Sequence, residues 1–96
     1  MNLSFHPEAE LELIEAAVYY EHALPGLGER FEAEVRRASG LLLATPEIGP
    51  FIESGLRKFV LTGFPYNLIY VLSNESVYIV AVAHHKRKPG YWRSRV

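Results

Sequence analysis

The chain has 96 residues, of which 49% are apolar and 22% are charged, and its formal net charge is −1. This length supports one hydrophobic core, so we expect a single domain over residues 1–96. The absence of cysteine excludes a disulfide framework and cysteine-based nucleophile or metal chemistry. No apolar stretch approaches the roughly 20 residues of a membrane span, and the N-terminus lacks the basic and apolar regions of a signal peptide. We therefore expect a cytoplasmic protein with no membrane partner.

The small net charge conceals a division between the two halves of the chain. Residues 1–55 contain ten acidic and three basic residues, for a net charge of −7. Residues 56–96 contain seven basic residues and one acidic residue, for a net charge of +6. This asymmetry has two interpretations. Either the basic half binds an anionic partner, or an acidic helical layer and a basic sheet edge complement each other.

The first half of the chain has the periodicity of helices after a short possible edge strand at residues 2–5. Pro7 suits the first turn of a helix, where its missing N–H costs nothing. Apolar residues at helical spacing predict the core face of this helix, namely Leu11, Leu13, Ile14, Ala17, Val18 and Tyr20. Glutamates predict its solvent face, namely Glu8, Glu12 and Glu15.

A break at residues 24–28, which holds one proline and two glycines, separates this helix from a second one. The core face of the second helix is predicted to carry Phe31, Val35, Ala38 and Leu42. Proline and glycine residues at positions 45–50 end it. A connection this short between two amphipathic helices predicts an antiparallel hairpin.

The second half has three strand-like runs, at residues 56–61, 66–72 and 77–84, separated by a turn at 62–65 and a loop at 73–76. The last run is almost purely apolar, so we place it at the centre of the sheet. Together these elements predict an α+β fold in β-α-α-β-β-β order. A short N-terminal strand precedes an antiparallel helical hairpin, which packs on one face of a small, mostly antiparallel sheet.

The opposite face of this sheet has little of the chain left to cover it. An uncovered apolar face is typical of an interaction surface. We expect Trp92 to anchor the C-terminal tail onto the sheet, and Pro89-Gly90 to end the last strand, because proline is not accommodated in a central ladder.

A charged segment, HHKRKPGYW, follows the last strand from His84 to Trp92. His84 and His85 are adjacent at a strand end, so their side chains point to opposite faces and are poor partners for one metal ion. We predict no metal site. The run from Lys86 to Lys88 has two possible roles: it blunts a sheet edge, or it faces a charged target.

Several short segments in one order carry a family resemblance: Phe5-His6-Pro7-Glu8-Ala9, Phe64-Pro65-Tyr66, Ile69-Tyr70-Val71, Ala81-Val82-Ala83-His84, Lys86-Arg87 and Pro89-Gly90-Tyr91-Trp92. With the helical hairpin, they resemble the RelE/ParE toxin superfamily of type II toxin–antitoxin systems, and most of all its ParE-like plasmid-stabilisation toxins. The resemblance covers nearly the whole chain. It implies a growth-inhibiting toxin that needs no cofactor and that a cognate antitoxin protein neutralises.

The superfamily contains two activities, and the resemblance leaves both open. ParE-like members block DNA gyrase and replication without catalytic residues. RelE-like members are endoribonucleases that cleave mRNA in the ribosome, and their chemistry needs proton-transfer groups and cations at the phosphate. Asn67 stands where the resemblance places an arginine of the nucleases, which favours the ParE-like branch. A non-toxic protein-binding module on the same fold is a third possibility.

The candidate site residues follow from these two branches. If the chain is a nuclease, the resemblance makes the catalytic candidates His84, Lys86, Arg87 and Tyr91. In either branch, the basic second half supplies the residues expected to bind the target: Arg57, Lys58, Lys88, Arg93 and Arg95. Whether the chain is an enzyme therefore depends on the branch to which it belongs.

Overall fold

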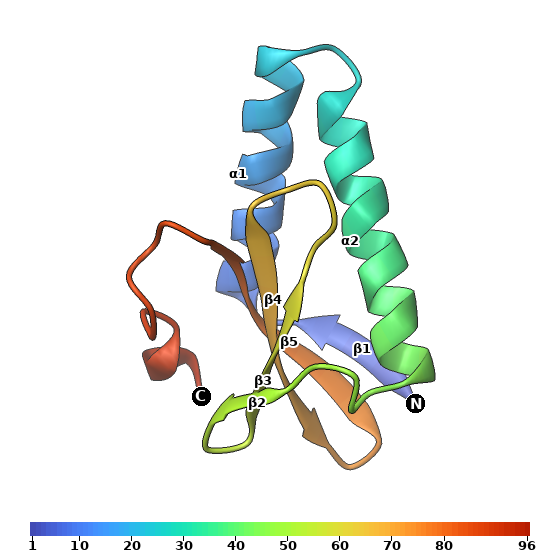
Figure 1. Ribbon diagram of the computed structural model, residues 1–96, viewed down its shortest axis with the longest axis vertical. Coiled ribbons are helices and arrows are strands. Elements are labelled where there is room, and N and C mark those ends of the chain that lie inside the picture. The colour runs from blue at the N-terminus through green and yellow to red at the C-terminus, as the bar shows by residue number, and fades with distance from the viewer.

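A computed structural model describes residues 1–96 and shows a helical hairpin against a five-stranded mixed sheet (Figure 1). The elements are β1 (Asn2–Phe5), α1 (Pro7–Ala23), α2 (Leu27–Ala44), β2 (Phe51–Glu53), β3 (Leu56–Val60), β4 (Tyr66–Ser73), β5 (Ser76–His84) and the 3₁₀ helix η1 (Arg93–Arg95). The predicted α+β class and the order of its elements are confirmed. The short strand β2 and the helix η1 were not predicted, because three residues are too few for a periodic pattern.

The strands lie in the order β1-β5-β4-β3-β2. β1 runs parallel to β5, and every other pair of neighbours is antiparallel. The apolar strand β5 is therefore interior, as predicted, although β4 rather than β5 takes the middle position. The connection between the parallel neighbours β1 and β5 runs through the helical hairpin and then through β2, β3 and β4, so it is long enough for parallel pairing.

Local sequence explains where the two helices begin. Pro7 is the first residue of α1, and the His6 Nδ1 atom accepts a hydrogen bond of 3.0 Å from the Glu8 N–H. Glu21 near the end of α1 caps α2, because its carboxylate accepts hydrogen bonds from the backbone N–H groups of Gly26 and Gly28 at 2.8 and 3.0 Å. The hairpin is thus joined at its turn as well as along its length. No helix combines the length and the hydropathy that crossing a bilayer requires.

The predicted core face is right for α2 and wrong for much of α1. Phe31, Val35, Ala38 and Leu42 are all buried, as expected. On α1 the buried residues are Ala9, Ala16 and Ala17, whereas Leu11, Ile14 and Val18 keep 51%, 49% and 50% of their surface exposed.

Glu12, predicted to face solvent, instead points inward, and its side chain is only 11% exposed. The small alanines let α1 approach its neighbours closely, and a carboxylate on the same face finds hydrogen-bond donors there. The prediction was right for Ala17, Leu13 and Tyr20, which lie in or against the core, and wrong for the line of apolar residues that stays exposed.

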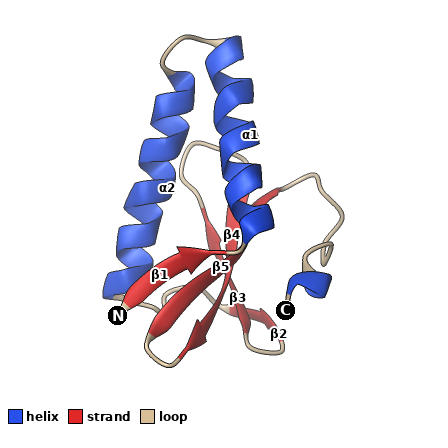
Figure 2. Cartoon of the chain, turned by 180° about the vertical axis from the view of Figure 1, so that it is seen from behind, coloured by secondary structure: helices blue, strands red, loops and turns tan.

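The sheet carries a core on each face. Beneath the helices, Phe31 and Leu42 pack on Leu68, Tyr70 and Ile79. On the other face, residues from three strands pack against Trp92, namely Leu56, Ile69, Val80, Ala81 and Ala83. Figure 2 shows the C-terminal segment turning back beside β2 and β3. Trp92 therefore anchors the tail as predicted, and the face expected to be bare is partly covered by the chain itself.

Gly28 marks a close approach of the two helices. A Cβ at this position would collide with the Ala17 carbonyl oxygen and would press on the Glu21 side chain. Gly40, near the C-terminal end of α2, has no atom near enough to contact an added Cβ. Alanine substitutions at these two glycines of one helix can therefore be compared directly, one with and one without a steric conflict.

We expect Gly28→Ala to lower the free energy of unfolding by about 1–3 kcal/mol, because the helices must separate to admit the methyl group. Gly40→Ala is expected to raise it by about 0.5–1 kcal/mol, since alanine restricts the unfolded chain and favours the helix. Urea denaturation measures both values. Equal shifts in the two variants would contradict the close approach at Gly28.

Candidate target-binding site

The Glu12 carboxylate is the centre of a hydrogen-bond network that holds the C-terminal segment. The Arg95 guanidinium donates to both of its oxygens, at 2.9 and 3.0 Å, and the Tyr91 hydroxyl donates at 2.7 Å. Arg87 makes a longer contact of 3.4 Å. The backbone N–H of Val82 on β5 donates at 3.0 Å. One carboxylate thus joins α1, β5 and the tail.

The position of this network follows from the unequal lengths of β1 and β5. The last residue of β1, Phe5, pairs with Ile79, so β5 continues past its parallel neighbour. The Val82 N–H lies in this extension and has no strand partner. A buried N–H without an acceptor is costly, and Glu12 on the following helix supplies the acceptor.

Tyr91 serves as an anchor in this arrangement. Burial, followed by the hydrogen bond to Glu12, raises the pKa of the Tyr91 phenol far above its ordinary value. The hydroxyl therefore stays protonated and donates to the carboxylate. The Arg87 guanidinium lies over the Tyr91 ring, 3.7 Å from its centre, which adds a cation–π contact.

A basic pocket of about 320 Å³ opens between the sheet and the tail. Its charged and polar walls come from Lys58 on β3, Asn67 on β4, and His85, Arg87 and Arg93 of the tail. Glu53 is the one acidic residue that lines it, so cations predominate. The pocket lies on the sheet face that carries Trp92.

The two histidines contact different neighbours at this pocket. The His85 Nε2 atom lies 3.0 Å from the Asn67 Oδ1 atom. The His84 ring packs edge-on against Tyr66, and its Nδ1 atom accepts a hydrogen bond from the Lys86 N–H.

The structure brings only some of the predicted site residues together. Lys58, His84, Arg87 and Arg93 line the basic pocket, whereas Tyr91 and Arg95 are held by Glu12. The other predicted residues lie outside the pocket, and only some of them form contacts within the chain. Arg57 donates to the carbonyls of Glu47 and Gly49 and lies over the Phe51 ring, while Lys86 and Lys88 are exposed on the loop after β5.

Three residues central to this region were missed by the sequence patterns. Glu12 has the appearance of one more solvent-facing glutamate, and Glu53, which pairs with Arg93 at 2.9 Å, lies in an unpredicted strand. Gly90 was recognised only as a strand terminator. Its φ of 85° turns the tail back toward the sheet, and an added Cβ would collide with the Arg93 guanidinium.

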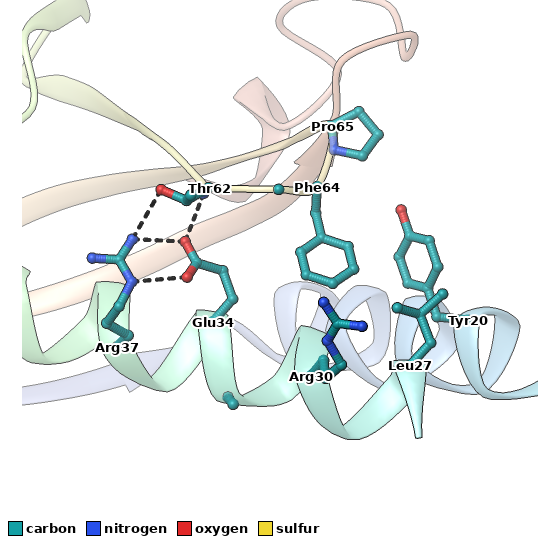
Figure 3. A pocket seen from close by; sticks show the side chains of 10 residues that line it. Tyr20, Leu27, Arg30, Glu34, Arg37, Thr62, Phe64 and Pro65 are labelled. Atoms are coloured by element: carbon teal, nitrogen blue, oxygen red, sulfur yellow. Dashed lines mark hydrogen bonds and ion pairs between the residues drawn. The ribbon is translucent and has the colours of Figure 1, made fainter. Parts of the chain in front are cut away.

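A second hollow lies between α2 and the turn after β3, where part of the family resemblance is found (Figure 3). The Glu34 carboxylate accepts two hydrogen bonds from Arg37, at 2.8 and 2.7 Å, and one from the Thr62 N–H at 2.6 Å. Phe64 packs against Tyr20 and Phe31, with ring centres 5.0 and 5.1 Å away. These contacts hold the Phe64-Pro65 turn against the hairpin.

Removing the Glu12 carboxylate tests whether it anchors the tail. We expect Glu12→Ala to lower the free energy of unfolding by about 2–4 kcal/mol, because Arg95 loses its carboxylate partner and the Val82 N–H loses its acceptor. Trp92 is the only tryptophan, so its fluorescence should shift to the red as the tail detaches. Glu15→Ala, an exposed change on the same helix, should alter stability by less than about 0.5 kcal/mol. An unchanged emission maximum in Glu12→Ala would refute the anchoring role.

Acid titration tests the Glu34 network. Hydrogen bonds from Arg37, the largest cause, and from Thr62 hold the pKa of Glu34 below its ordinary value of 4.5. A lowered native pKa means that the stabilisation is complete above pH 4.5 and is lost as the pH falls through the native pKa. The stability difference between wild type and Glu34→Gln should therefore shrink as the pH falls below 4.5. Glu32→Gln, an exposed change on the same helix, should show no such trend; a pH-independent difference for Glu34→Gln would refute the prediction.

Comparisons with known proteins agree with this fold. Residues 3–89 match the family model described as ParE toxin of type II toxin-antitoxin system, parDE. A solved structure titled "Chromosomal ParDE TA system from P. aeruginosa" superposes with a TM-score of 0.76 at 17% identity, covering 88% of this chain and 95% of that one. No curated protein sequence matches. Because the family model covers most of the chain, this protein belongs to the ParE toxin family of type II toxin–antitoxin systems.

Proposed function

We propose that this toxin acts in the cytoplasm, where it blocks DNA gyrase through its basic C-terminal loop, and that a cognate antitoxin neutralises it. The observation that carries the proposal is the engagement of the Tyr91 hydroxyl by Glu12. A phenol with a strongly raised pKa, donating to a carboxylate that is mostly shielded from solvent, is poorly suited to accept or transfer a proton during RNA cleavage. The tail is better suited to binding than to catalysis.

The free cations support contact with a target. Lys58, Lys86 and Lys88 form no ion pair, so their charges are available to an external partner. Arg93 and Arg95 are engaged by Glu53 and Glu12. Arg57 is likewise held by backbone carbonyls. Of the residues expected to bind the target, we therefore assign direct contact to Lys58 and Lys88 and a supporting role to the arginines. We add Lys86, a catalytic candidate in the nuclease branch, to the direct contacts.

Ribosome-dependent cleavage of mRNA is the second candidate, and the basic pocket favours it. Lys58, Arg87 and Arg93 line one hollow with His84 and His85, and such a group of cations suits a phosphate. Asn67 weighs against it, because a neutral amide paired with His85 supplies no positive charge where the nucleases have an arginine.

The target is identified by following macromolecular synthesis after induction of the toxin without its antitoxin. If gyrase is blocked, thymidine incorporation should fall before methionine incorporation, and the purified chain should inhibit supercoiling of relaxed plasmid by gyrase. An earlier fall in methionine incorporation would instead support mRNA cleavage. Growth that continues while the folded protein accumulates would argue for a non-toxic binding module.

Charge reversal tests the role of the loop. We expect Lys86→Glu with Lys88→Glu to weaken gyrase inhibition by roughly tenfold or more, because both lysines are exposed and face the target. Thermal stability should change little. Arg36→Glu, at an exposed and unpaired cation on α2, is the matched control and should inhibit like the wild type. Equal inhibition by the double variant and the wild type would exclude the loop as the contact.

A further inference from the structure

The basic pocket between the sheet and the tail follows from the alternation of side chains along the strands. Leu56 of β3 belongs to the core on the Trp92 face, so Lys58, two residues further along the strand, lies on the same face. Its partner on β4 is Ile69, another residue of that core. A cation is thus set into a largely apolar face, where the C-terminal segment turns back beside β2 and β3 (Figure 2).

Several hydrogen-bond donors that line this pocket are not used within the chain. Lys58 forms no ion pair. Arg93 gives only its Nε–H to Glu53, at 3.2 and 2.9 Å, which leaves the two terminal NH₂ groups of the guanidinium free. The Nδ1 atom of His84 accepts from the Lys86 N–H, so a neutral ring carries its proton on Nε2, where it is a further donor.

Acceptors are scarce in the same pocket. Glu53 is the only carboxylate in its lining, and this carboxylate is already paired with Arg93. With Lys58, Arg87 and Arg93 against this one acid, the lining has a net charge of +2 when both histidines are neutral. The pocket therefore lacks acceptor oxygens and negative charge, and a bound oxyanion supplies both.

The indole of Trp92 shows the same lack of acceptors. Trp92 lines the pocket and is 8% exposed, and its Nε1–H is the one buried side-chain donor of the chain that has no hydrogen-bond partner. Buried polar groups without partners are rare in folded proteins and call for an explanation. An acceptor that enters the pocket is such an explanation.

Charge and shape favour a phosphate monoester over other oxyanions. A monoester carries a charge of about −1.5 to −2 at neutral pH, which matches the lining, whereas each phosphate within an RNA or DNA strand is a diester with a single charge. The two free NH₂ groups of Arg93 form a fork that suits two oxygens of one phosphate. A carboxylate offers less charge and one oxygen fewer.

The pocket also has room and surface for the organic part of such a ligand. Its volume of about 320 Å³ is roughly ten times the ~30 Å³ share of one water in the liquid, so a phosphate ion fills only part of it. Beside the cations, the lining includes the apolar side chains of Ile52, Ile69 and Trp92. A planar ring against these side chains loses apolar surface to water while the phosphate stays at the cations. Nucleotides combine these two parts.

We propose that this pocket is a binding site for a free nucleotide, whose terminal phosphate lies among Lys58, Arg87 and Arg93 and whose base lies against Ile52 and Trp92. The inference goes beyond the proposed function, because it assigns a small ligand to a site that needs neither gyrase nor RNA cleavage. Lys58 is shared with the proposed gyrase contact, whereas the exposed lysines of the loop after β5 are not part of the pocket.

Titration of the purified full chain with AMP tests the site directly. Trp92 is the only tryptophan, so its indole N–H gives a single signal in proton–nitrogen NMR spectra, and AMP should shift this signal in a saturable way. Cyclic AMP has the same base but a diester with one negative charge, and adenosine has no phosphate. Both should bind at least roughly tenfold more weakly than AMP, because charged hydrogen bonds are lost. Inorganic phosphate should displace AMP, but with a lower affinity.

Single substitutions test the residues of the site. Lys58→Gln and Arg93→Gln should each weaken AMP binding roughly tenfold or more, since each removes a charged donor to the phosphate. Arg36→Gln is the matched control, because it removes an exposed cation of α2 outside the pocket, and it should bind AMP as the wild type does. Circular dichroism verifies that each variant is folded. Because Arg93 also pairs with Glu53, Lys58→Gln decides the test if Arg93→Gln does not fold.

Several outcomes would overturn the proposal. One is the absence of a saturable shift of the Trp92 indole signal with AMP. Another is equal affinity for AMP and for cyclic AMP, adenosine or inorganic phosphate, because the monoester or the base would then contribute nothing. Unchanged AMP affinity in Lys58→Gln would do the same. All of these measurements use the isolated chain, so a failure of growth arrest refutes the proposed function and leaves the nucleotide site to be decided by the titrations.

Discussion

One carboxylate, that of Glu12, determines how the ends of the chain are arranged around the sheet. Taking a charge out of water is costly, and Glu12 is stable in its position because Arg95, Tyr91 and the Val82 N–H all donate to it. It lies within the first turns of α1, so it also links the start of the chain to its end. The C-terminal segment follows from this contact, since Trp92 lies next to Tyr91 and closes the second face of the sheet.

The same anchor gives the basic loop its position. β5 holds the loop at His84, and the Glu12 network holds it from Tyr91 onward. The intervening lysines are therefore presented at a defined place beside the pocket, and their side chains form no ion pair within the chain. A short loop held at both ends loses less conformational entropy on binding than a free tail would. This arrangement suits a binding segment, in agreement with the function proposed for it.

Ion pairs within the chain account for only part of the division of charge between its two halves. Part of it is internal complementarity, because Glu12 and Glu53 of the acidic half pair with arginines of the basic half. The remainder is not neutralised within the chain. It consists of the lysines around the C-terminal loop and of the glutamates beside the exposed apolar residues of α1, so the protein presents one basic and one acidic surface. Partners of opposite charge can therefore engage it at separate places.

Sequence periodicity was sufficient to predict the elements in which one apolar pattern has no competing alternative. The buried face of α2 was predictable because Phe31, Val35 and Leu42 repeat without competing polar residues, and β4 and β5 were predictable as long apolar runs bounded by turns. The resemblance carried by the turn at Phe64-Pro65 and by the segment after β5 identified the family. Each of these signals lies within one short stretch of sequence, so it can be recognised without knowledge of the neighbouring elements.

Only the tertiary structure determines which face of α1 packs against the core and which role Glu12 has. The helix carries apolar residues on more than one side, and the side that packs was selected by the small size of Ala16 and Ala17 and by an unpaired N–H on β5. Neither cause is visible in the periodicity of α1, because the first depends on how closely two helices approach and the second on where β1 stops. For the same reason, the free and the engaged cations could be told apart only once Glu12 and Glu53 had been placed beside the tail.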